Sequence, residues 1–149
     1  MKIDYLVIAD AAASADGKLY IHGAAWDTMG VLSFPAVRPT MAIAIRFRVP
    51  WNETDRQHSM DLDVLDEDGR SILPPERGHL RGTLTIGRPD DLPPGAEQTT
   101  ALVIELQQLR FEKPGTYVVT CSVDDGVDEV RSPFRAVQRP LGPNQGMAR

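Results

Sequence analysis

Residues 41–49 read Met41-Ala42-Ile43-Ala44-Ile45-Arg46-Phe47-Arg48-Val49, so large apolar side chains alternate with small or charged ones. Successive side chains of a β-strand point to opposite faces, and this period of two therefore predicts a strand with one buried and one solvated face. The same alternation recurs over residues 60–64, 80–86 and 117–123. These separate segments all indicate β-structure.

The residues between these segments are typical of tight turns and loops. Asp16-Gly17, Asp68-Gly69 and Asp125-Gly126 each separate two strand-like runs, and both positions of such a pair tolerate positive φ. Proline clusters at 74–75, 93–94 and 114 mark loops. We expect strands over 3–13, 18–24, 28–34, 40–49, 57–67, 70–73, 79–87, 99–109, 116–124 and 129–137. This density of turns predicts an all-β fold, an antiparallel β-sandwich of immunoglobulin-like or jelly-roll-like type.

The segment from Ala96 to Leu109 fits two secondary structures. Leu102, Leu106 and Leu109 have helical spacing, whereas the β-branched residues of the segment favour a strand. We prefer the strand.

Length and composition predict one domain over residues 1–137 and a flexible tail over 138–149, because the tail has few apolar residues. The formal net charge of −5 disfavours nucleic acid as a partner, since binding to its backbone needs clustered cations. Cys121 is the single cysteine, and aspartates interrupt the apolar N-terminal stretch. We therefore expect a soluble cytoplasmic protein with no export signal, no membrane span and no intramolecular disulfide.

Two resemblances follow from particular residues. Gly115-Thr116-Tyr117 resembles the entry to a late strand of immunoglobulin-like sandwiches, where the tyrosine hydroxyl bonds back to an upstream loop. The chain as a whole, from Met1-Lys2-Ile3-Asp4-Tyr5 through 47–53 and 87–89 to Pro133-Phe134-Arg135, resembles a small bacterial family of unknown function. That resemblance implies a compact β domain and brings no activity or functional residues with it.

Metal and catalytic motifs are weak in this sequence. The acidic run 61–69 fails the EF-hand spacing, although Asp66 and Asp68 could form a looser calcium site with Asp124, Asp125 or Asp128 if the two turns share one end of the fold. His22, His58 and His79 lack zinc-site spacing, and Cys121 falls in register with core residues. We predict no cofactor and no catalytic residues.

The most interesting exposed candidates are Trp51, Asn52 and Glu53, which follow a strand that ends in proline. A loop tryptophan flanked by polar residues is typical of ligand or partner contacts, and the alternative is that Trp51 covers the open end of the sandwich.

Three functions remain open. The favoured hypothesis is a non-catalytic protein-binding or self-assembly module, a homo-oligomer in which a second copy lies on a smooth outer face at Ala42 and Ala44. The alternatives are a carbohydrate-type ligand module that uses Trp51 and a divergent enzyme without a recognisable motif.

Overall fold

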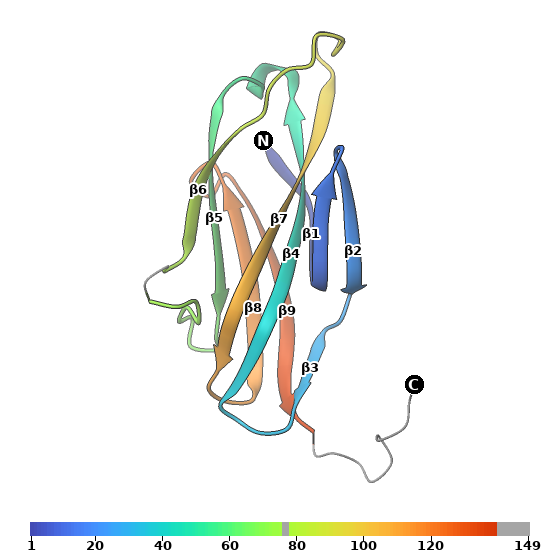
Figure 1. Cartoon of the computed structure of the whole chain (residues 1–149). Coiled ribbons are helices and arrows are strands. Elements are labelled where there is room, and N and C mark those ends of the chain that lie inside the picture. Colours follow the sequence, from blue (N-terminus) through green and yellow to red (C-terminus); the bar gives the residue numbers. More distant parts are fainter. Residues whose placement is uncertain (76–77, 140–149) are drawn as a thin grey trace.

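The computed structural model describes residues 1–75 and 78–139, which form two β-sheets packed face to face (Figure 1). One sheet has the strand order β2-β1-β4-β7 and the other has the order β3-β9-β8-β5-β6. The strands are β1 (Lys2–Ala15), β2 (Lys18–Ala24), β3 (Thr28–Val31), β4 (Ala36–Pro50), β5 (Gln57–Leu65), β6 (Leu80–Thr85), β7 (Glu97–Phe111), β8 (Gly115–Val123) and β9 (Asp128–Gln138), and a short 3-10 helix, η1 (Trp51–Glu53), follows β4. The predicted all-β sandwich is confirmed. The predicted tail lies mostly outside the described residues.

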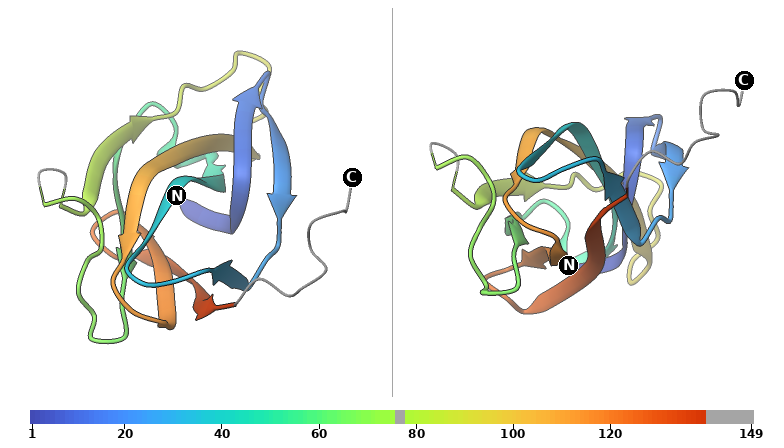
Figure 2. Two further views of the ribbon diagram at one scale, coloured as in Figure 1. Left: turned by 60° about the horizontal axis from the view of Figure 1, so that its bottom comes forward. Right: turned by 90° about the horizontal axis from the view of Figure 1, so that it is seen from below.

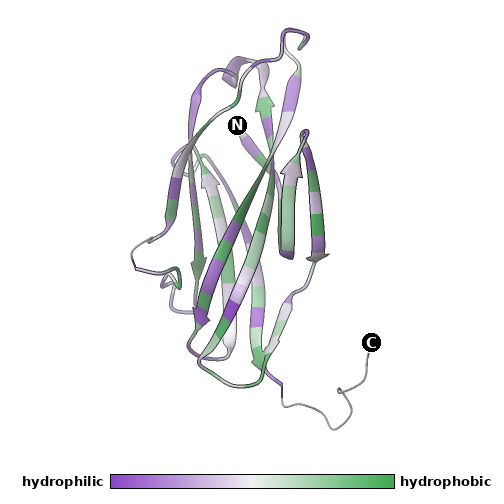
Figure 3. Ribbon diagram, in the orientation of Figure 1, coloured by the Kyte–Doolittle hydropathy of each residue, from purple (hydrophilic) through white to green (hydrophobic). Residues whose placement is uncertain are grey.

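The core forms between the inner faces of the two sheets. In β4, Ile43, Ile45 and Phe47 are completely buried, as the alternation of residues 41–49 predicts. In β8, Val119 and Cys121 point into the same layer and are completely buried too. Figure 3 shows the corresponding alternation of apolar and polar residues along the central strands.

The five-stranded sheet is mixed rather than purely antiparallel. β3 pairs with β9 in parallel, with Thr28 opposite Arg135 and Val31 opposite Gln138. The other pairs of neighbouring strands in this sheet are antiparallel. The predicted strand 28–34 therefore ends at Val31, and the chain then turns into the start of β4.

The strand predicted over residues 99–109 is confirmed as part of β7, so the helical alternative for this segment is wrong. Its β-branched residues pair with β4, and tertiary pairing therefore decides a segment that spacing alone leaves ambiguous. The strand predicted over 70–73 is wrong, because that segment makes only a single bridge, Leu65 to Ser71.

Tyr117 makes the predicted tyrosine corner. Its hydroxyl donates to the carbonyl oxygen of Lys113 at 2.7 Å, and its ring packs against Phe111 and Phe134. Burial raises the pKa of this hydroxyl above its ordinary value. The turn before β8 is thereby fixed to the core.

The outer face of the four-stranded sheet is covered by the chain itself. β1 pairs with β4 from Lys2 to Ala9 and then with β2 from Ala9 to Ala15. β1 turns sharply between the part that pairs with β4 and the part that pairs with β2, so that the β1–β2 hairpin comes back toward the start of β7 (Figures 1 and 2). The turn residues Gly17 and Lys18 line one hollow together with Thr99 of β7.

This arrangement corrects the expectation of a smooth, open face at Ala42 and Ala44. The two side chains are 1% and 0% exposed, and that of Ala9 on the neighbouring strand is 0% exposed. We attribute their burial to the hairpin and to the larger outward residues Val7 and Val103, which flank Ala44. Small side chains on the outer face allow this close approach, and they are not available to a second copy of the chain.

The outer face of the five-stranded sheet carries polar and charged side chains at partly or fully exposed positions. Thr120 and Ser122 of β8 are half-buried, while Arg131 and Pro133 of β9 are exposed. This face is hollowed around Asp61 and Ser122. In the described ranges 1–75 and 78–139, no helix has the length and apolar character to cross a membrane.

Candidate functional site

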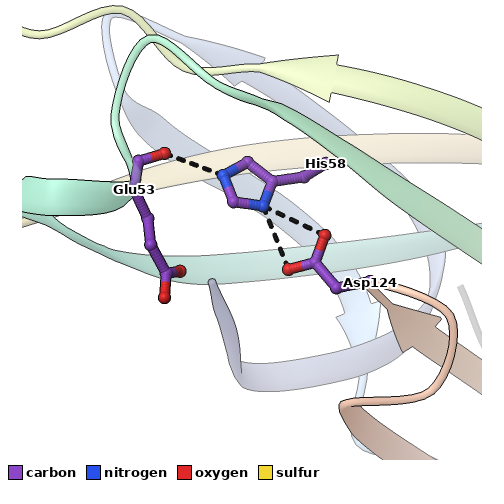
Figure 4. Close-up of side chains that lie close together, drawn as sticks. All are labelled: Glu53, His58 and Asp124. Atoms are coloured by element: carbon purple, nitrogen blue, oxygen red, sulfur yellow. Dashed lines mark hydrogen bonds and ion pairs between the residues drawn. The ribbon is translucent and has the colours of Figure 1, made fainter.

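Three potential metal ligands meet at the end of the sandwich where η1, the start of β5 and the β8–β9 turn come together (Figure 4). They are Glu53, His58 and Asp124, and one ligand atom of each lies within 4.8 Å of the others. Glu53 and His58 are five residues apart in the sequence, whereas Asp124 lies 66 residues after His58. The pairing of β5 with β8, which places Met60 opposite Val123, brings two of them together.

His58 is the centre of this cluster and is only 4% exposed. Its Nδ1 lies 3.0 Å from both carboxylate oxygens of Asp124, and its Nε2 lies 2.8 Å from the carbonyl oxygen of Glu53. Carboxylate and carbonyl oxygens can only accept hydrogen bonds, so both ring nitrogens are satisfied when both carry a proton. Each ring nitrogen of the buried His58 thus faces an acceptor.

The α-amino group of Met1 completes the cluster. It forms an ion pair with the Glu53 carboxylate and lies 3.6 Å from Oδ2 of Asp124, and its side chain is buried in the core. The carboxylates of Glu53 and Asp124 therefore both face the Met1 ammonium, and that of Asp124 also contacts His58.

Nearby backbone contacts connect the cluster to both sheets. The amide of Ile3 in β1 donates to Oδ2 of Asp128 at 2.7 Å, and the amide of Asp124 donates to the carbonyl of Ser59 at 2.9 Å. A metal ion at this place would compete with the Met1 ammonium for Glu53 and with the bonds that His58 already makes. The arrangement therefore fits an internal ion network that joins β1, η1, β5 and the β8–β9 turn.

The predicted contact residues Trp51, Asn52 and Glu53 form η1, and their side chains lie in different environments. The guanidinium carbon of Arg88 lies 3.8 Å from the centroid of the Trp51 ring, so a cation covers one ring face. Arg88 is held there because its Nε donates to Oγ1 of Thr54 at 2.7 Å and its Nη2 donates to the carbonyl of Trp51 at 3.0 Å. This stacking leaves less ring surface for a sugar.

Glu53 takes part in the ion network, whereas Asn52 is exposed to solvent. The three neighbours in sequence thus do not form one contact surface. Sequence reasoning missed His58, Asp124 and Arg88 as their partners, because only the strand register and the loop after β6 bring these residues to η1.

The looser calcium site is contradicted by the topology. Asp66 follows the end of β5, where Leu65 pairs with Val118, whereas Asp124 follows the end of β8, where Val123 pairs with Met60. Since β5 and β8 are antiparallel, the two acidic turns lie at opposite ends of the sheet, on the order of 20 Å apart. Asp66 instead accepts the amides of Asp68 and Arg70 at 2.9 Å, which lower its pKa.

Cys121 lies in the core, in the register that the sequence predicts. It is completely buried, and burial raises the pKa of its thiol to about 12. A thiol in this state is not an activated nucleophile.

Comparison with solved structures gives a weak similarity. A family 123 glycoside hydrolase from Clostridium perfringens that hydrolyses glycolipid glycans aligns with a TM-score of 0.30 and 12% sequence identity. The alignment covers 77% of this chain and 23% of the hydrolase, so the chain spans less than a quarter of that protein. No curated protein sequence matches the chain.

The family comparison covers most of the chain, from near the start of β1 to the last buried residue of β9. The match runs over residues 4–136 and includes every strand of both sheets. The chain belongs to the Family of unknown function (DUF6941).

Proposed function

We propose that this protein is a non-catalytic binding module that associates with a second copy of itself through the free edge of β7. Within the described ranges 1–75 and 78–139, β7 pairs with β4 on one side and is the last strand of its sheet. Leu102 and Ile104 of β7 remain half-exposed, whereas Ile45 and Ile43 opposite them on β4 are completely buried. This incomplete burial at the edge of the core is the observation that carries the proposal.

β7 is also the longest of the edge strands, with 15 residues against 4 in β3, 6 in β6 and 7 in β2. From Glu97 to Gln107 it is uninterrupted, and the positive φ of 56° at Gln108 then breaks the regular strand. An exposed edge of this length offers unpaired backbone groups to another strand, because short strands and bulges are the usual protection.

The charges along β7 suit pairing with itself. In a symmetric antiparallel ladder centred on Leu102, Glu105 faces the partner's Thr99 and Glu97 faces the partner's Gln107. No carboxylate then faces another across the ladder, and like charges directly opposite would be unfavourable. Symmetric dimers are the commonest oligomers, and a two-fold axis through Leu102 produces one.

The non-catalytic part of the proposal is supported by Cys121 and His58. The thiol is buried and protonated at neutral pH, and each nitrogen of His58 already contacts an acceptor. The proposal also keeps the chain in the bacterial cytoplasm, an expectation that rests on its single cysteine.

The test is the molar mass in solution, measured by size exclusion with light scattering at about 100 μM, where a micromolar interface is populated. We expect twice the monomer mass for the wild type and the monomer mass for Ile104→Lys. Leu84→Lys is the matched control, because Leu84 is equally half-buried on the edge strand β6 of the other sheet. A wild-type monomer, or equal dissociation by both variants, contradicts the proposal.

A further inference from the structure

A hollow of about 280 Å³ lies between the tip of the β1–β2 hairpin and the four-stranded sheet beneath it. The sheet contributes Tyr5, Arg46, Thr99 and Thr100, and the hairpin contributes the turn that ends at Lys18. The hollow exists because β1 turns at Ala9 and returns over its own sheet. It is separate from the ion network at Glu53, His58 and Asp124.

The hairpin turn is rigidly specified. Asp16 and Gly17 have φ values of 52° and 71°, which is the conformation of a two-residue hairpin turn with positive φ at both positions. This geometry matches the right-handed twist of the flanking strands, so the turn holds Lys18 at the rim of the hollow. The wall formed by the turn is therefore built into the fold.

The charged residues that line this hollow are Lys18 and Arg46, and both are cations. Arg46 lies 3.4 Å from Asp4, and Arg48 lies 2.7 Å from Asp4 and 4.0 Å from Glu97, so these two guanidinium groups are paired with two carboxylates. The residues that line the hollow themselves include two cations and no carboxylate, in a chain whose formal net charge is −5. Such a lining attracts an anion, and Arg is suited to oxyanions because its donors form a planar fork.

The remaining lining groups are suited to the body of an organic ligand. Thr99, which lies opposite the outward-facing Arg48, offers a hydroxyl that can donate and accept. The Tyr5 ring is 38% exposed and has the Arg46 guanidinium 5.9 Å from its centroid, so it presents a partly open aromatic surface beside the cation. A volume of about 280 Å³ is at the lower end of small-ligand pockets and holds a ligand of monosaccharide size.

From these contacts we infer that the hollow binds a small organic phosphate or sulfate, with the oxyanion at Arg46 and Lys18 and the organic body against Tyr5 and Thr99. This site does not require the self-association proposed for the edge of β7, although Thr99 belongs to both surfaces.

The experiment titrates the full chain with glucose 1-phosphate, inorganic phosphate and glucose at low ionic strength, and follows backbone amides by heteronuclear NMR. We expect saturable shifts at Gly17, Lys18 and Thr99–Ala101 with glucose 1-phosphate, about tenfold weaker binding of inorganic phosphate, and no binding of glucose. Glucose binding as tight as that of the phosphate ester contradicts recognition of the anion. Equal binding of inorganic phosphate contradicts recognition of an organic body.

Variants locate the site. Arg46→Gln and Lys18→Gln should each weaken glucose 1-phosphate binding about tenfold, and Arg46→Lys should weaken it less because the charge remains. Arg131→Gln on the outer face of the other sheet is the control and should leave binding unchanged. Lys18 is exposed, so its variant tests the site even if Arg46→Gln fails to fold. Unchanged binding in the Lys18 variant, or shifts confined to other strands, overturns the inference.

Discussion

The two outer faces of this sandwich differ, although each belongs to a sheet whose inner face is equally apolar. On the four-stranded sheet the side chains of Ala42 and Ala44 are 1% and 0% exposed, because the hairpin of β1 and β2 returns over them. On the five-stranded sheet Thr120 and Ser122 occupy the corresponding central strand and remain half-exposed. Strand alternation thus identifies the inner face of each sheet but does not say whether its outer face is open.

The difference has a consequence for the self-association. A second copy has no access to Ala42 and Ala44, so the contact surface proposed here moves from the face of the sheet to the edge at β7. The same hairpin that closes the face also creates the hollow at Arg46. The turn within β1 therefore decides which surfaces of this sheet are available to a second copy of the chain or to a ligand.

The largest expected effect separates the two faces. Ala44→Lys places a charge beneath the hairpin and should lower the free energy of unfolding by about 3 kcal/mol or more, because a buried unpaired charge is costly. Thr120→Lys places the same charge on the open face and should change it by less than about 1 kcal/mol. Urea denaturation of both variants measures the difference. Equal losses would show that both faces are equally open or equally covered.

The ion network at the end of the sandwich gives the next effect. Asp124→Asn keeps the shape of the side chain and suits the positive φ of 52° at this position, but it removes the charge that faces His58. The free energy of unfolding should fall by about 2 kcal/mol, the range for losing a charged hydrogen bond at a buried group.

Asp125→Asn is the matched control for that variant. Asp125 has nearly the same φ of 55°, and its contact with Ser59 is made by the backbone amide, so the substitution should change stability by less than about 0.5 kcal/mol. A similar loss in both variants would mean that the turn, and not the network, is stabilising.

A smaller effect is expected on the five-stranded sheet. Tyr117→Phe keeps the buried ring and removes the hydroxyl that donates to Lys113, so the free energy of unfolding should fall by about 1 kcal/mol. Leucine at the position would remove ring packing as well and should cost more. Denaturation of both variants distinguishes the hydrogen bond from the ring. A Phe variant as stable as the wild type contradicts a stabilising role for the corner.

The smallest effect concerns Cys121 in the core between the two faces. Its pKa is raised from 9.0 to about 12 by burial, so the unfolded state loses the thiol proton at lower pH than the folded state. The contribution to stability is fully present below pH 9.0 and is lost as the pH rises through about 12. Wild type should therefore lose more stability than Cys121→Ala over this range, measured by urea denaturation at each pH. If the free energy of unfolding depended on pH in the same way in both proteins, that result would argue against a buried thiol.

Much of the fold follows from local patterns. Residues 41–49 and 117–123 form strands with the predicted buried faces, and Asp16-Gly17 forms the predicted turn, since alternation and turn chemistry act between near neighbours. The turn of β1 at Ala9 could not be predicted in this way. Leu6, Val7 and Ile8 are three consecutive apolar residues, so their sequence does not show which of them points to the outer face. Only the folded chain shows that Val7 does so and that the hairpin covers it.

Local sequence patterns predict the candidate site even less well than the fold. The sequence predicts Glu53 as a ligand or partner contact beside Trp51, whereas in the structure its side chain pairs with Met1 and its carbonyl oxygen accepts from His58. Positions 1, 53, 58 and 124 come together through the register of β5 with β8 and of β1 with β4, and that register is set by non-local pairing.

Chemical labelling of single introduced thiols would compare the two outer faces most directly. Ser122→Cys is a nearly isosteric change and Ala44→Cys adds a single sulfur atom. The native Cys121 is buried, so the introduced thiol is the one that labelling reports in each variant. We expect the thiol at 122 to react freely with an aromatic disulfide reagent and the thiol at 44 to react at least about a hundredfold more slowly, through opening of the hairpin. Equal labelling rates at the two positions would contradict a hairpin that covers one face and leaves the other open.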